Sequence, residues 1–596
     1  MFTKVLVANR GEIAVRVIRA CEELGVGTVA VYSELDRDAL HVRRADEAYL
    51  LGPGPAAESY LNVAKLIEVI RASGADAVHP GYGFLAENAG FAARLEEIGV
   101  TFIGPSAAAI EAMGSKTRAR ELMAAAGVPI VPGTTEPVET VEDARRIIAA
   151  QIGYPVAVKA AGGGGGKGFR VALTEAELQD AFEGAAREGE KFFGDATVYL
   201  ERYLPDPRHV EVQILADKHG NVIHLGERDC SLQRRHQKLI EEAPAPAVER
   251  IPGLRERIGK IGTDAAAAVG YAGAGTIEGL LQDGEYFFLE MNTRVQVEHC
   301  VTEMVTGVDI VKEGIRVAAG EPLSIRQEDV VLRGHAIECR INAEDASRNF
   351  APAPGAITNY REPSGPGVRV DSGVGPGSEV SPMYDPMVGK LIVWDSDREQ
   401  ATRRMVRALR EFEIGGLKTL LPFHEAILQT EQWASAETCR DLIEDREWLK
   451  SLAFPRIDPV AADGEQRLEL EYTVEVSGKR FDVRVIGEPA AAGPLTSSGA
   501  TPPAGARPAP RRGSRARQST NGHSGDTLTS PLQGTVFRVA VEPGQTVDEG
   551  ALVCVIEAMK MENEITAHKA GVVVELGVSV GAAVSIGDTL AIISAE

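Results

Sequence analysis

The chain of 596 residues is poor in cysteine and in long apolar runs. Its six cysteines stand at 21, 230, 300, 339, 439 and 554, so no Cys-x-x-Cys pair and no Cys/His pair has zinc-site spacing. They are too sparse for a disulfide scaffold, which indicates a reducing compartment, and we expect a cytoplasmic protein. No 18 apolar residues run together, so no transmembrane helix is predicted. The first apolar run is too short for a signal peptide.

Positive charge is also in short supply, because 63 basic residues face 86 acidic ones and the net charge is −23. An acidic protein is repelled by phosphate backbones and by anionic membranes, so we expect neither nucleic acid nor membrane as a partner. The composition, with 44% hydrophobic residues, is ordinary for a globular protein. At roughly 150 residues per domain, the length predicts about four domains or three large ones.

The first 115 or so residues alternate between strand and helix patterns. Apolar runs at 5–8, 29–32, 76–79 and 101–103 indicate buried strands, and apolar residues recur at helical spacing over 12–24. This order predicts a parallel sheet with helices on both faces.

A glycine-rich loop follows a predicted strand at 154–159. Five glycines at 162–166 precede Lys167 and Gly168, and such a run lets backbone N–H groups approach phosphate oxygens. It is not a Walker A loop, because residue 161 is Ala and residue 168 is Gly. We interpret it as a phosphate cover rather than a mobile linker. Lys116 and Lys159 could neutralise nucleotide phosphates, although a single lysine is more often a surface charge.

Two carboxylates are expected to face each other across a hairpin. Asp283-Gly284 indicates the turn, and a three-residue loop at 283–285 would put Glu278 opposite Glu290. Paired carboxylates repel unless a cation lies between them, and Mg²⁺ takes such oxygen ligands.

The strand period extends this polar face. If the chain stays extended beyond Glu290, then Asn292, Arg294, Gln296 and Glu298 share its face, whereas the odd-numbered residues are mostly apolar. The alternative is a solvated edge, but the neighbouring glycine loop favours a binding site.

The C-terminal 70 residues contain an internal repeat. Glycines and aliphatic residues between 534 and 558 recur 37 positions later, between 571 and 595. Two short copies related by a pseudo-twofold axis would close a small β-sandwich.

Two segments precede this repeat. Residues 468–476 and 479–486 alternate like a β-hairpin around Ser477-Gly478. Residues 487–526, with six Pro and seven Gly, are interpreted as a flexible tether with a reach of roughly 35 Å.

These motifs together resemble a known family. Ala8-Asn-Arg-Gly-Glu-Ile-Ala14, His79-Pro-Gly-Tyr-Gly-Phe-Leu-Ala-Glu-Asn88, the glycine loop and Glu290-Met-Asn-Thr-Arg-Val-Gln-Val-Glu-His299 are similar to those of biotin carboxylases of the ATP-grasp superfamily. Glu557-Ala-Met-Lys-Met-Glu-Asn563 resembles the biotinylation motif of a biotin carboxyl carrier domain. The whole chain resembles the α subunit of a bacterial acetyl- or propionyl-CoA carboxylase, an enzyme of fatty acid synthesis.

The resemblance implies a multidomain α/β and α+β fold ending in an all-β flattened barrel of the biotinyl/lipoyl type. The implied segments are a Rossmann-like preATP-grasp domain at 1–114, an ATP-grasp domain with a glycine-rich lid at 115–330, a biotin carboxylase C-terminal domain at 331–450, a short β segment with a possible partner-docking role at 451–486, the tether at 487–526 and the carrier domain at 527–596.

The resemblance also implies roles for individual residues. The implied ATP-binding residues are Lys116, Lys159, Gly165, Gly166, Glu201, Leu204, His209, Gln233 and His236. The implied ligands of Mg²⁺ or Mn²⁺ are Glu278, Glu290 and Asn292. The implied bicarbonate and biotin contacts are Lys238, Arg294, Gln296, Val297, Tyr82, Gly83 and Arg340. The implied catalytic residues are Lys238, Arg294, Glu298 and Arg340.

In the implied chemistry, Glu298 deprotonates bicarbonate, which attacks the γ-phosphate of ATP to give carboxyphosphate. The permanent cation Arg340 then steadies the biotin enolate. Lys560 lies between the two repeat copies, at an expected hairpin tip, and is the implied site of covalent biotin. On its own, Met-Lys-Met is more safely interpreted as a surface lysine between two core methionines. A lipoyl carrier shares the repeated architecture, but methionine on both sides of the lysine resembles the biotinyl form.

No stretch remains for a carboxyltransferase, so the resemblance implies a separate β subunit, a biotin protein ligase that loads the carrier, and a homo-oligomer within a larger complex. The subunit of a pyruvate or 2-oxoglutarate carboxylase is an alternative, because these residues do not specify the acceptor. Two further alternatives are an ATP-grasp ligase that joins a carboxylate to an amine and a non-catalytic carrier scaffold. Intact Lys238, Glu298 and Arg340 argue against both.

Overall fold

The computed structural model describes residues 1–134, 136–160, 168–193, 196–453, 468–476, 479–487, 526–530, 534–558, 561–584 and 587–594. The chain divides into two units, of which one is formed by Met1–Ala453 and Leu528–Glu596 and the other by Phe454–Thr527.

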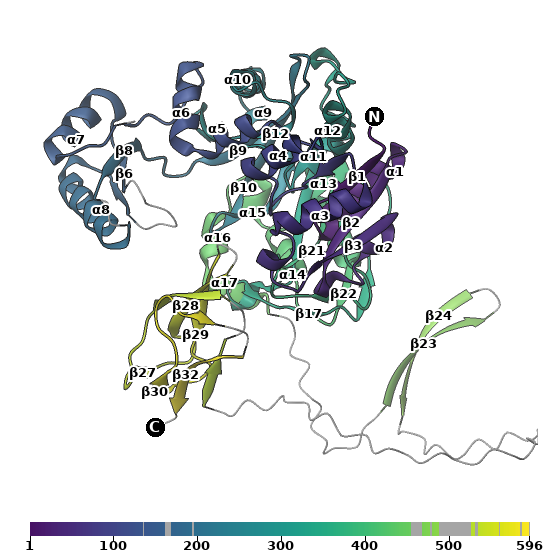
Figure 1. Cartoon of the computed structure of the whole chain (residues 1–596). Coiled ribbons are helices and arrows are strands. Elements are labelled where there is room, and N and C mark those ends of the chain that lie inside the picture. Colours follow the sequence, from purple (N-terminus) through teal and green to yellow (C-terminus); the bar gives the residue numbers. More distant parts are fainter. Residues whose placement is uncertain are drawn as a thin grey trace, which may run out of the picture. The chain divides into compact units, whose positions relative to one another are not determined.

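The N-terminal segment forms the predicted parallel sheet (Figure 1). Its strands, in the spatial order β3-β2-β1-β4-β5, are β1 (Lys4–Val7), β2 (Gly27–Ser33), β3 (Glu47–Gly52), β4 (Ala77–His79) and β5 (Thr101–Phe102). The accompanying helices are α1 (Gly11–Glu23), α2 (Leu40–Arg44), α3 (Val63–Ser73), α4 (Ala89–Glu97) and α5 (Ala107–Gly114). Val5 and Val7 pack with α1, whereas Leu6 packs with α3 and α4. Alternate residues of β1 therefore face opposite layers of helices, as predicted.

A small three-stranded sheet follows in the order β7-β6-β8. Its elements are α6 (Lys116–Ala125), α7 (Val141–Ile147), β6 (Val156–Ala160), β7 (Phe169–Ala172), α8 (Leu178–Phe193) and β8 (Val198–Arg202). The predicted strand before the glycine loop is thus confirmed as β6. Lys159 pairs with Phe169, so the glycine run joins two antiparallel neighbours. The run itself, 161–167, lies outside the described residues.

An eight-stranded antiparallel sheet carries most of the predicted site. In spatial order it consists of β13 (Glu285–Asn292), β12 (Gly273–Gln282), β9 (Arg208–Ala216), β10 (Val222–Arg234), β11 (Gln237–Ala243), β14 (His335–Asn342), β21 (Met387–Asp395) and β19 (Val368–Ser372). This one sheet crosses the boundary expected at 330/331, because β11 pairs directly with β14.

Helices and short strands surround this sheet. The helices are α9 (Pro246–Glu249), α10 (Leu254–Ala268), α11 (His299–Thr306), α12 (Ile310–Ala318), α13 (Arg398–Glu411), α14 (Leu421–Ile427), α15 (Glu431–Ala434), α16 (Arg440–Glu444) and α17 (Arg446–Ser451). The two-stranded sheets are β15 (Glu344–Asp345) with β16 (Ala351–Pro352), β17 (Gly355–Ala356) with β20 (Glu379–Val380), and β18 (Asn359–Arg361) with β22 (Glu413–Gly415).

The β12–β13 hairpin confirms the predicted pairing by a different route. Gln282 pairs with Glu285, so the loop has two residues, Asp283 and Gly284, both at positive φ, and the predicted three-residue loop is wrong. The register then shifts between Glu278 and Gly279, and this bulge brings Glu278 opposite Glu290 after all. The extra residue, Leu289, is 42% exposed.

The C-terminal segment forms two four-stranded sheets, as the repeat predicts (Figure 1). The strands are β25 (Thr527–Thr529), β26 (Gly534–Val539), β27 (Thr546–Val547), β28 (Leu552–Ala558), β29 (Met561–Thr566), β30 (Gly571–Leu576), β31 (Ala583–Val584) and β32 (Thr589–Ser594). The sheets have the orders β25-β32-β30-β27 and β29-β28-β26-β31. Bulges at Val536/Arg538 and at Val573/Glu575 lie at equivalent positions of the two copies.

Lys560 lies outside the described residues. The strands on either side of it pair as a hairpin, with Ala558 opposite Met561. In the second unit, β23 (Leu468–Val476) and β24 (Lys479–Gly487) form the hairpin predicted from the alternating pattern.

All six cysteines are buried and none forms a disulfide. Of the helices in the described ranges, none has the length and apolar character that a bilayer crossing requires.

Candidate active site

A row of charged residues crosses four strands of the large sheet. Glu290 pairs with Glu278, Glu278 pairs with Glu211 on β9, and Glu211 pairs with Arg228 on β10. Arg228 donates from Nε to Glu211, and its guanidinium is fully buried. The sheet register therefore concentrates three carboxylates and a cation in one place.

Lys238, on β11, is the cation that connects this row to the following loop. Its ammonium donates to Glu211 at 2.6 Å, Glu278 at 3.0 Å and Glu298 at 2.6 Å. Burial alone would lower the pKa of Lys238, but Glu211 and Glu298 outweigh it and hold the pKa well above the usual value. The lysine is therefore charged and shared by three acids.

Glu278 accepts several hydrogen bonds at once. Asn292 Nδ2 and Gln296 Nε2 donate to its Oε1 at 2.8 and 2.6 Å, and His209 Nε2 lies 3.0 Å from its Oε2. Burial would raise the pKa of Glu278, yet Lys238 and His209 hold it far below the usual value. With Glu290 opposite, the ionised carboxylate and the amide oxygen of Asn292 form a set of hard oxygen donors that suits Mg²⁺ or Mn²⁺.

Glu298 is held between cations. Arg340, on β14, donates to Glu298 Oε2 at 3.0 Å and from Nε to Glu241 at 2.6 Å. Burial would raise the pKa of Glu298, but Lys238, Arg340 and Arg228 lower it strongly. Glu298 is thus ionised and able to accept a proton once a bound anion competes for these cations.

The extended face predicted for 290–298 is only partly correct. β13 ends at Asn292, and the chain then turns toward α11. Arg294 turns to Glu87, with Nε 3.0 Å from its carboxylate, and donates to Asn292 Oδ1 at 2.8 Å. Gln296 and Glu298 nevertheless return to the centre. Convergence here results from a loop that folds back, not from strand periodicity.

The predicted nucleotide residues lie in two groups. Lys159 on β6 and Glu201 on β8 form an ion pair at 2.5 Å, and Arg120 also contacts Glu201 at 3.2 Å. Leu204 is buried. Gln233 and His236 lie at the β10–β11 turn, and His209 contacts Glu278 as described above.

Three predicted nucleotide residues are described only in part or not at all. Lys116 is the first residue of α6, but its side chain is outside the description. Gly165 and Gly166 lie outside the described residues.

Tyr82 and Gly83 lie in a loop after β4 that the N-terminal motif holds. Asn9 Nδ2 donates to the carbonyls of Pro80 and Tyr82 at 2.8 and 2.7 Å. The Tyr82 hydroxyl donates to Glu12 on α1. Gly83 has a positive φ of 67°, a conformation that favours glycine.

Sequence reasoning missed four residues of this centre, namely Arg228, Glu211, Glu241 and Glu12. Each is a charged residue among buried neighbours. An acid or a guanidinium within an apolar strand is rarely buried without a partner, so this pattern could have identified the first three.

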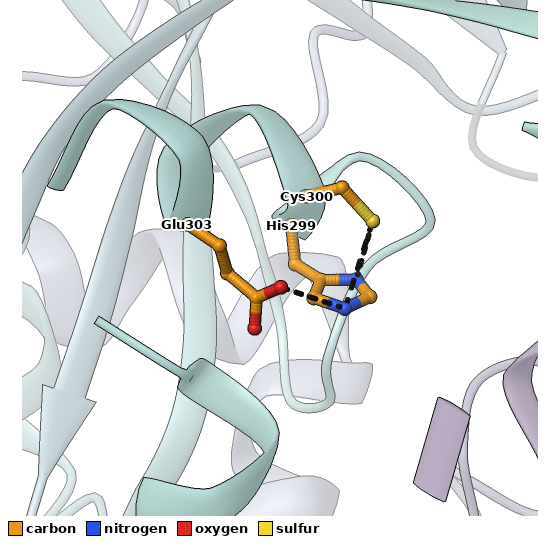
Figure 2. A group of neighbouring side chains, drawn as sticks. All are labelled: His299, Cys300 and Glu303. Atoms are coloured by element: carbon orange, nitrogen blue, oxygen red, sulfur yellow. Dashed lines mark hydrogen bonds and ion pairs between the residues drawn. The ribbon is translucent and has the colours of Figure 1, made fainter. Parts of the chain in front are cut away.

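A second cluster lies on α11, where His299, Cys300 and Glu303 face one another (Figure 2). Cations already surround it, because Arg16 and Arg369 donate to Glu303 and Lys390 donates to Cys300 Sγ at 3.1 Å. Burial raises the pKa of the Cys300 thiol well above its usual value. Three cations thus already contact the thiol and the carboxylate, and we interpret the cluster as a structural support.

The chain matches four family descriptions along its length. Residues 1–110 match the biotin carboxylase N-terminal domain, 115–326 the ATP-binding domain of the carbamoyl-phosphate synthase L chain, 338–445 the biotin carboxylase C-terminal domain and 526–593 the domain of biotin-requiring enzymes.

Relatives and solved structures agree with these matches. Biotin carboxylase 1 of Bacillus subtilis is 56% identical over 439 residues, which are 73% of this chain and 97% of the relative. The biotin-dependent acyl-coenzyme A carboxylase alpha3 subunit of Mycobacterium leprae is 47% identical over 593 residues, 99% and 98% of the two chains. The biotin carboxylase domain of the 2-oxoglutarate carboxylase of Hydrogenobacter thermophilus, solved with MgADP, ADP and bicarbonate, has a TM-score of 0.68 at 50% identity and covers 75% of this chain and 99% of its own.

The ATP-grasp fold and its carboxylate-rich centre thus define the class of protein, an ATP-dependent ligase. The chain belongs to the biotin carboxylase family, and a biotin carrier domain is fused to its C-terminal end.

Proposed function

We propose that this chain carboxylates biotin on its own carrier domain, using bicarbonate and ATP, as the α subunit of an acetyl- or propionyl-CoA carboxylase. The observation that carries the first half is the contact of Lys238 with Glu298, which Arg340 also contacts. The acyl-CoA assignment is supported by the alignment with the Mycobacterium leprae subunit, because that relative matches over 99% of this chain, tether and carrier included.

The nucleotide roles follow from charge and position. Lys159, Lys116 and His209 are assigned to the ATP phosphates, with Gly165 and Gly166 as their cover. Glu201 would hold Lys159 in place through the 2.5 Å ion pair. Mg²⁺ or Mn²⁺, bound by Glu278, Glu290 and Asn292, would neutralise charge on the phosphates. The remaining ATP contacts are assigned to Leu204, Gln233 and His236.

Bicarbonate is assigned to the space bordered by Lys238, Arg294, Gln296 and the backbone of Val297. These groups are cations and hydrogen-bond donors, which match an anion. An anion that takes up the charge of Lys238 and Arg340 reduces their hold on Glu298 and raises its basicity. Glu298 can then accept the bicarbonate proton, while Arg340 stabilises the negative charge that develops beside it.

The carrier role is assigned to Lys560. The paired strands β28 and β29 end on either side of it, so a prosthetic group attached there would project from a hairpin. A biotin protein ligase would attach it. Tyr82 and Gly83 are assigned to the face that receives biotin.

We assign the second half-reaction to a separate carboxyltransferase β subunit, because the relative that matches over 99% of this chain is itself one subunit of an acyl-coenzyme A carboxylase. The β23–β24 hairpin is a hypothetical docking element for it, and we expect a homo-oligomer within the complex. A pyruvate or 2-oxoglutarate carboxylase is the second candidate, because the Hydrogenobacter thermophilus neighbour belongs to a 2-oxoglutarate carboxylase.

Two measurements test the first half of the proposal. ATP cleavage should depend on bicarbonate and increase with free biotin, and Glu298→Gln should abolish this increase. Loss of stimulation in the wild type would refute the proposal. The intact mass should show one biotin increment that disappears in Lys560→Arg. The tether at 487–526 contains no lysine, so Lys569→Arg in the carrier serves as the control.

The acceptor is tested with the co-expressed carboxyltransferase subunit. Transfer of labelled carboxyl groups to acetyl-CoA or propionyl-CoA, and not to pyruvate or 2-oxoglutarate, is expected. The reverse preference would favour the second candidate.

A further inference from the structure

The motif at the start of α1 contains a buried acid that the proposed chemistry does not use. Glu12 is 6% exposed, and its Oε1 accepts the hydroxyl of Tyr82. Its other oxygen, Oε2, has no hydrogen-bond partner in the structure. A buried carboxylate in this state destabilises the fold, which favours a role for Glu12 other than stability.

Lys390 of β21 forms an ion pair with the same oxygen of this carboxylate. Its Nζ lies 3.7 Å from Glu12 Oε1 and donates to the carbonyl of Val297 at 2.6 Å. It also donates to Cys300 Sγ at 3.1 Å, at the start of α11. Lys390 is fully buried. A single ammonium therefore connects Glu12 with the backbone of residues 293–298, the segment between β13 and α11 to which bicarbonate is assigned and which we call the bicarbonate loop.

The backbone is shaped to allow this approach. A Cβ added at Gly373, just after β19, would lie 2.5 Å from the backbone nitrogen of Glu12. Only a residue without a side chain lets the chain after β19 pass so close to the first turn of α1. The connection is thus built from three separate parts of the sequence, around residues 12, 373 and 390.

We propose that Glu12 and Lys390 are positioning residues that hold the biotin-facing loop, through Tyr82, in register with the bicarbonate loop, through Val297. This inference rests on the proposed function, since it assigns Tyr82 to biotin and Val297 to bicarbonate. Neither residue touches substrate in it. Glu12 orients the Tyr82 ring, and Lys390 fixes the distance between the two loops.

The charges around Glu12 give the inference a pH signature. Lys390 faces Glu12 from β21, Arg369 and Asp371 from β19, and Asp385 from the segment before β21. Burial raises the pKa of Glu12 to about 7, against the opposing effect of Lys390. Below that pH the wild-type carboxyl is neutral and resembles a glutamine. Above it the ionised carboxylate binds the Tyr82 hydroxyl and Lys390 more strongly.

The test compares wild type and Glu12→Gln in the full-length chain, with Lys560→Arg in both so that free biotin is the only acceptor. Bicarbonate-dependent ATP cleavage is measured against biotin concentration from pH 6 to pH 8.5. The wild-type to variant ratio of kcat/KM for biotin should be near one at pH 6 and rise to about tenfold above pH 7.5, the loss of one charge-assisted hydrogen bond. KM for ATP should not change. Glu22→Gln, an exposed carboxylate of the same helix, is the matched control.

A second variant separates positioning from packing. In the Tyr82→Phe background, Glu12→Gln should have little further effect on kcat/KM for biotin, because the hydroxyl it orients is gone. A pH-independent ratio, or full additivity of the two substitutions, would overturn the inference. A wild-type chain without biotin-stimulated ATP cleavage would instead refute the proposed function.

Discussion

Replacement of Arg228 should lower kcat/KM for bicarbonate more than kcat/KM for ATP. The guanidinium donates to Glu211 and Gln213, to the hydroxyls of Thr276 and Thr302, and to Gln296 Oε1 at 2.9 Å. Methionine has a similar length and none of these donors. Gln296 would lose the donor to its amide oxygen, and Glu211 would lose one of its two close cations and keep Lys238 at 2.6 Å.

The magnitude follows from the bonds removed. A buried hydrogen bond to a charged group contributes about 1.5–3 kcal/mol, so Arg228→Met should lower kcat/KM for bicarbonate roughly 10- to 150-fold. Removing one partner of a buried ion pair also costs about 3–5 kcal/mol of stability. Arg228→Lys keeps the charge but cannot serve five acceptors, so it should fold better and show a smaller loss of the same kind.

The assay is initial-rate ATP cleavage with bicarbonate and ATP varied separately, together with thermal melting. The control is Arg255→Met, because Arg255 contacts the buried acid Glu227 at 2.7 Å and belongs to no part of the proposed site. The control should have a lower melting temperature than the wild type but an unchanged KM for bicarbonate. An unchanged kcat/KM for bicarbonate in Arg228→Met, or equal losses toward bicarbonate and ATP, would refute the reasoning.

Three further predictions concern the fold and the metal. Gly373→Ala should lower the melting temperature by the equivalent of about 1–3 kcal/mol, because its Cβ would overlap the backbone at Glu12, whereas Gly375→Ala, with nothing within 4 Å, should not. Glu12→Gln should raise the melting temperature at pH 8 but scarcely at pH 5. Burial raises the pKa of Glu12 from 4.5 to about 7, so its ionised carboxylate destabilises the fold by up to about 3 kcal/mol at pH 8 and by little at pH 5. An equal gain at both pH values would contradict this. Glu290→Gln should raise the Mg²⁺ concentration for half-maximal ATP cleavage about 10- to 100-fold, with Glu285→Gln of the same strand as control and an unchanged requirement as the contrary result.

Local patterns predicted local structure well in this chain. The continuous apolar run at 5–8 predicts β1, because a parallel strand is buried on both faces. The helical spacing of apolar residues over 12–24 predicts α1. The repeat at an offset of 37 predicted a double-layered C-terminal sandwich, and the two bulges lie at equivalent positions. These features depend on residues close in sequence or on direct repetition.

The hairpin at 278–290 shows where such reasoning is incomplete. The Asp283-Gly284 turn and the pairing of Glu278 with Glu290 are predicted correctly, but the predicted loop is one residue too long and the bulge that restores the register is not predicted. The position of a bulge depends on packing on both faces of the strand, and the periodicity of one sequence does not predict it. The loop after Asn292 was missed for the same reason, because its course depends on Glu87 and Lys390, which are distant in sequence.

The contacts of Arg228 and Lys238 could not be predicted because they arise from sheet order. Glu211, Arg228, Lys238 and Glu278 come from β9, β10, β11 and β12, and only the order β12-β9-β10-β11 brings them together. The sequence of a single strand does not specify which strands lie beside it in an antiparallel sheet. The polar residues could be identified as candidates, but not their partners.

The charge balance of the centre explains why a divalent cation belongs in the proposed reaction. Glu211, Glu278 and Glu298 share the cation Lys238, while Arg228 also contacts Glu211 and Arg340 also contacts Glu298. These cations are therefore already engaged by buried carboxylates, in a region of low dielectric where a further negative charge is expensive. Mg²⁺ bound at Glu278 and Glu290 would compete with Lys238 for Glu278 and leave its ammonium freer to bind the incoming anion. Metal binding should therefore strengthen bicarbonate binding, and bicarbonate affinity measured with Mg²⁺ should exceed that in its absence; equal affinities would show that the two sites are independent.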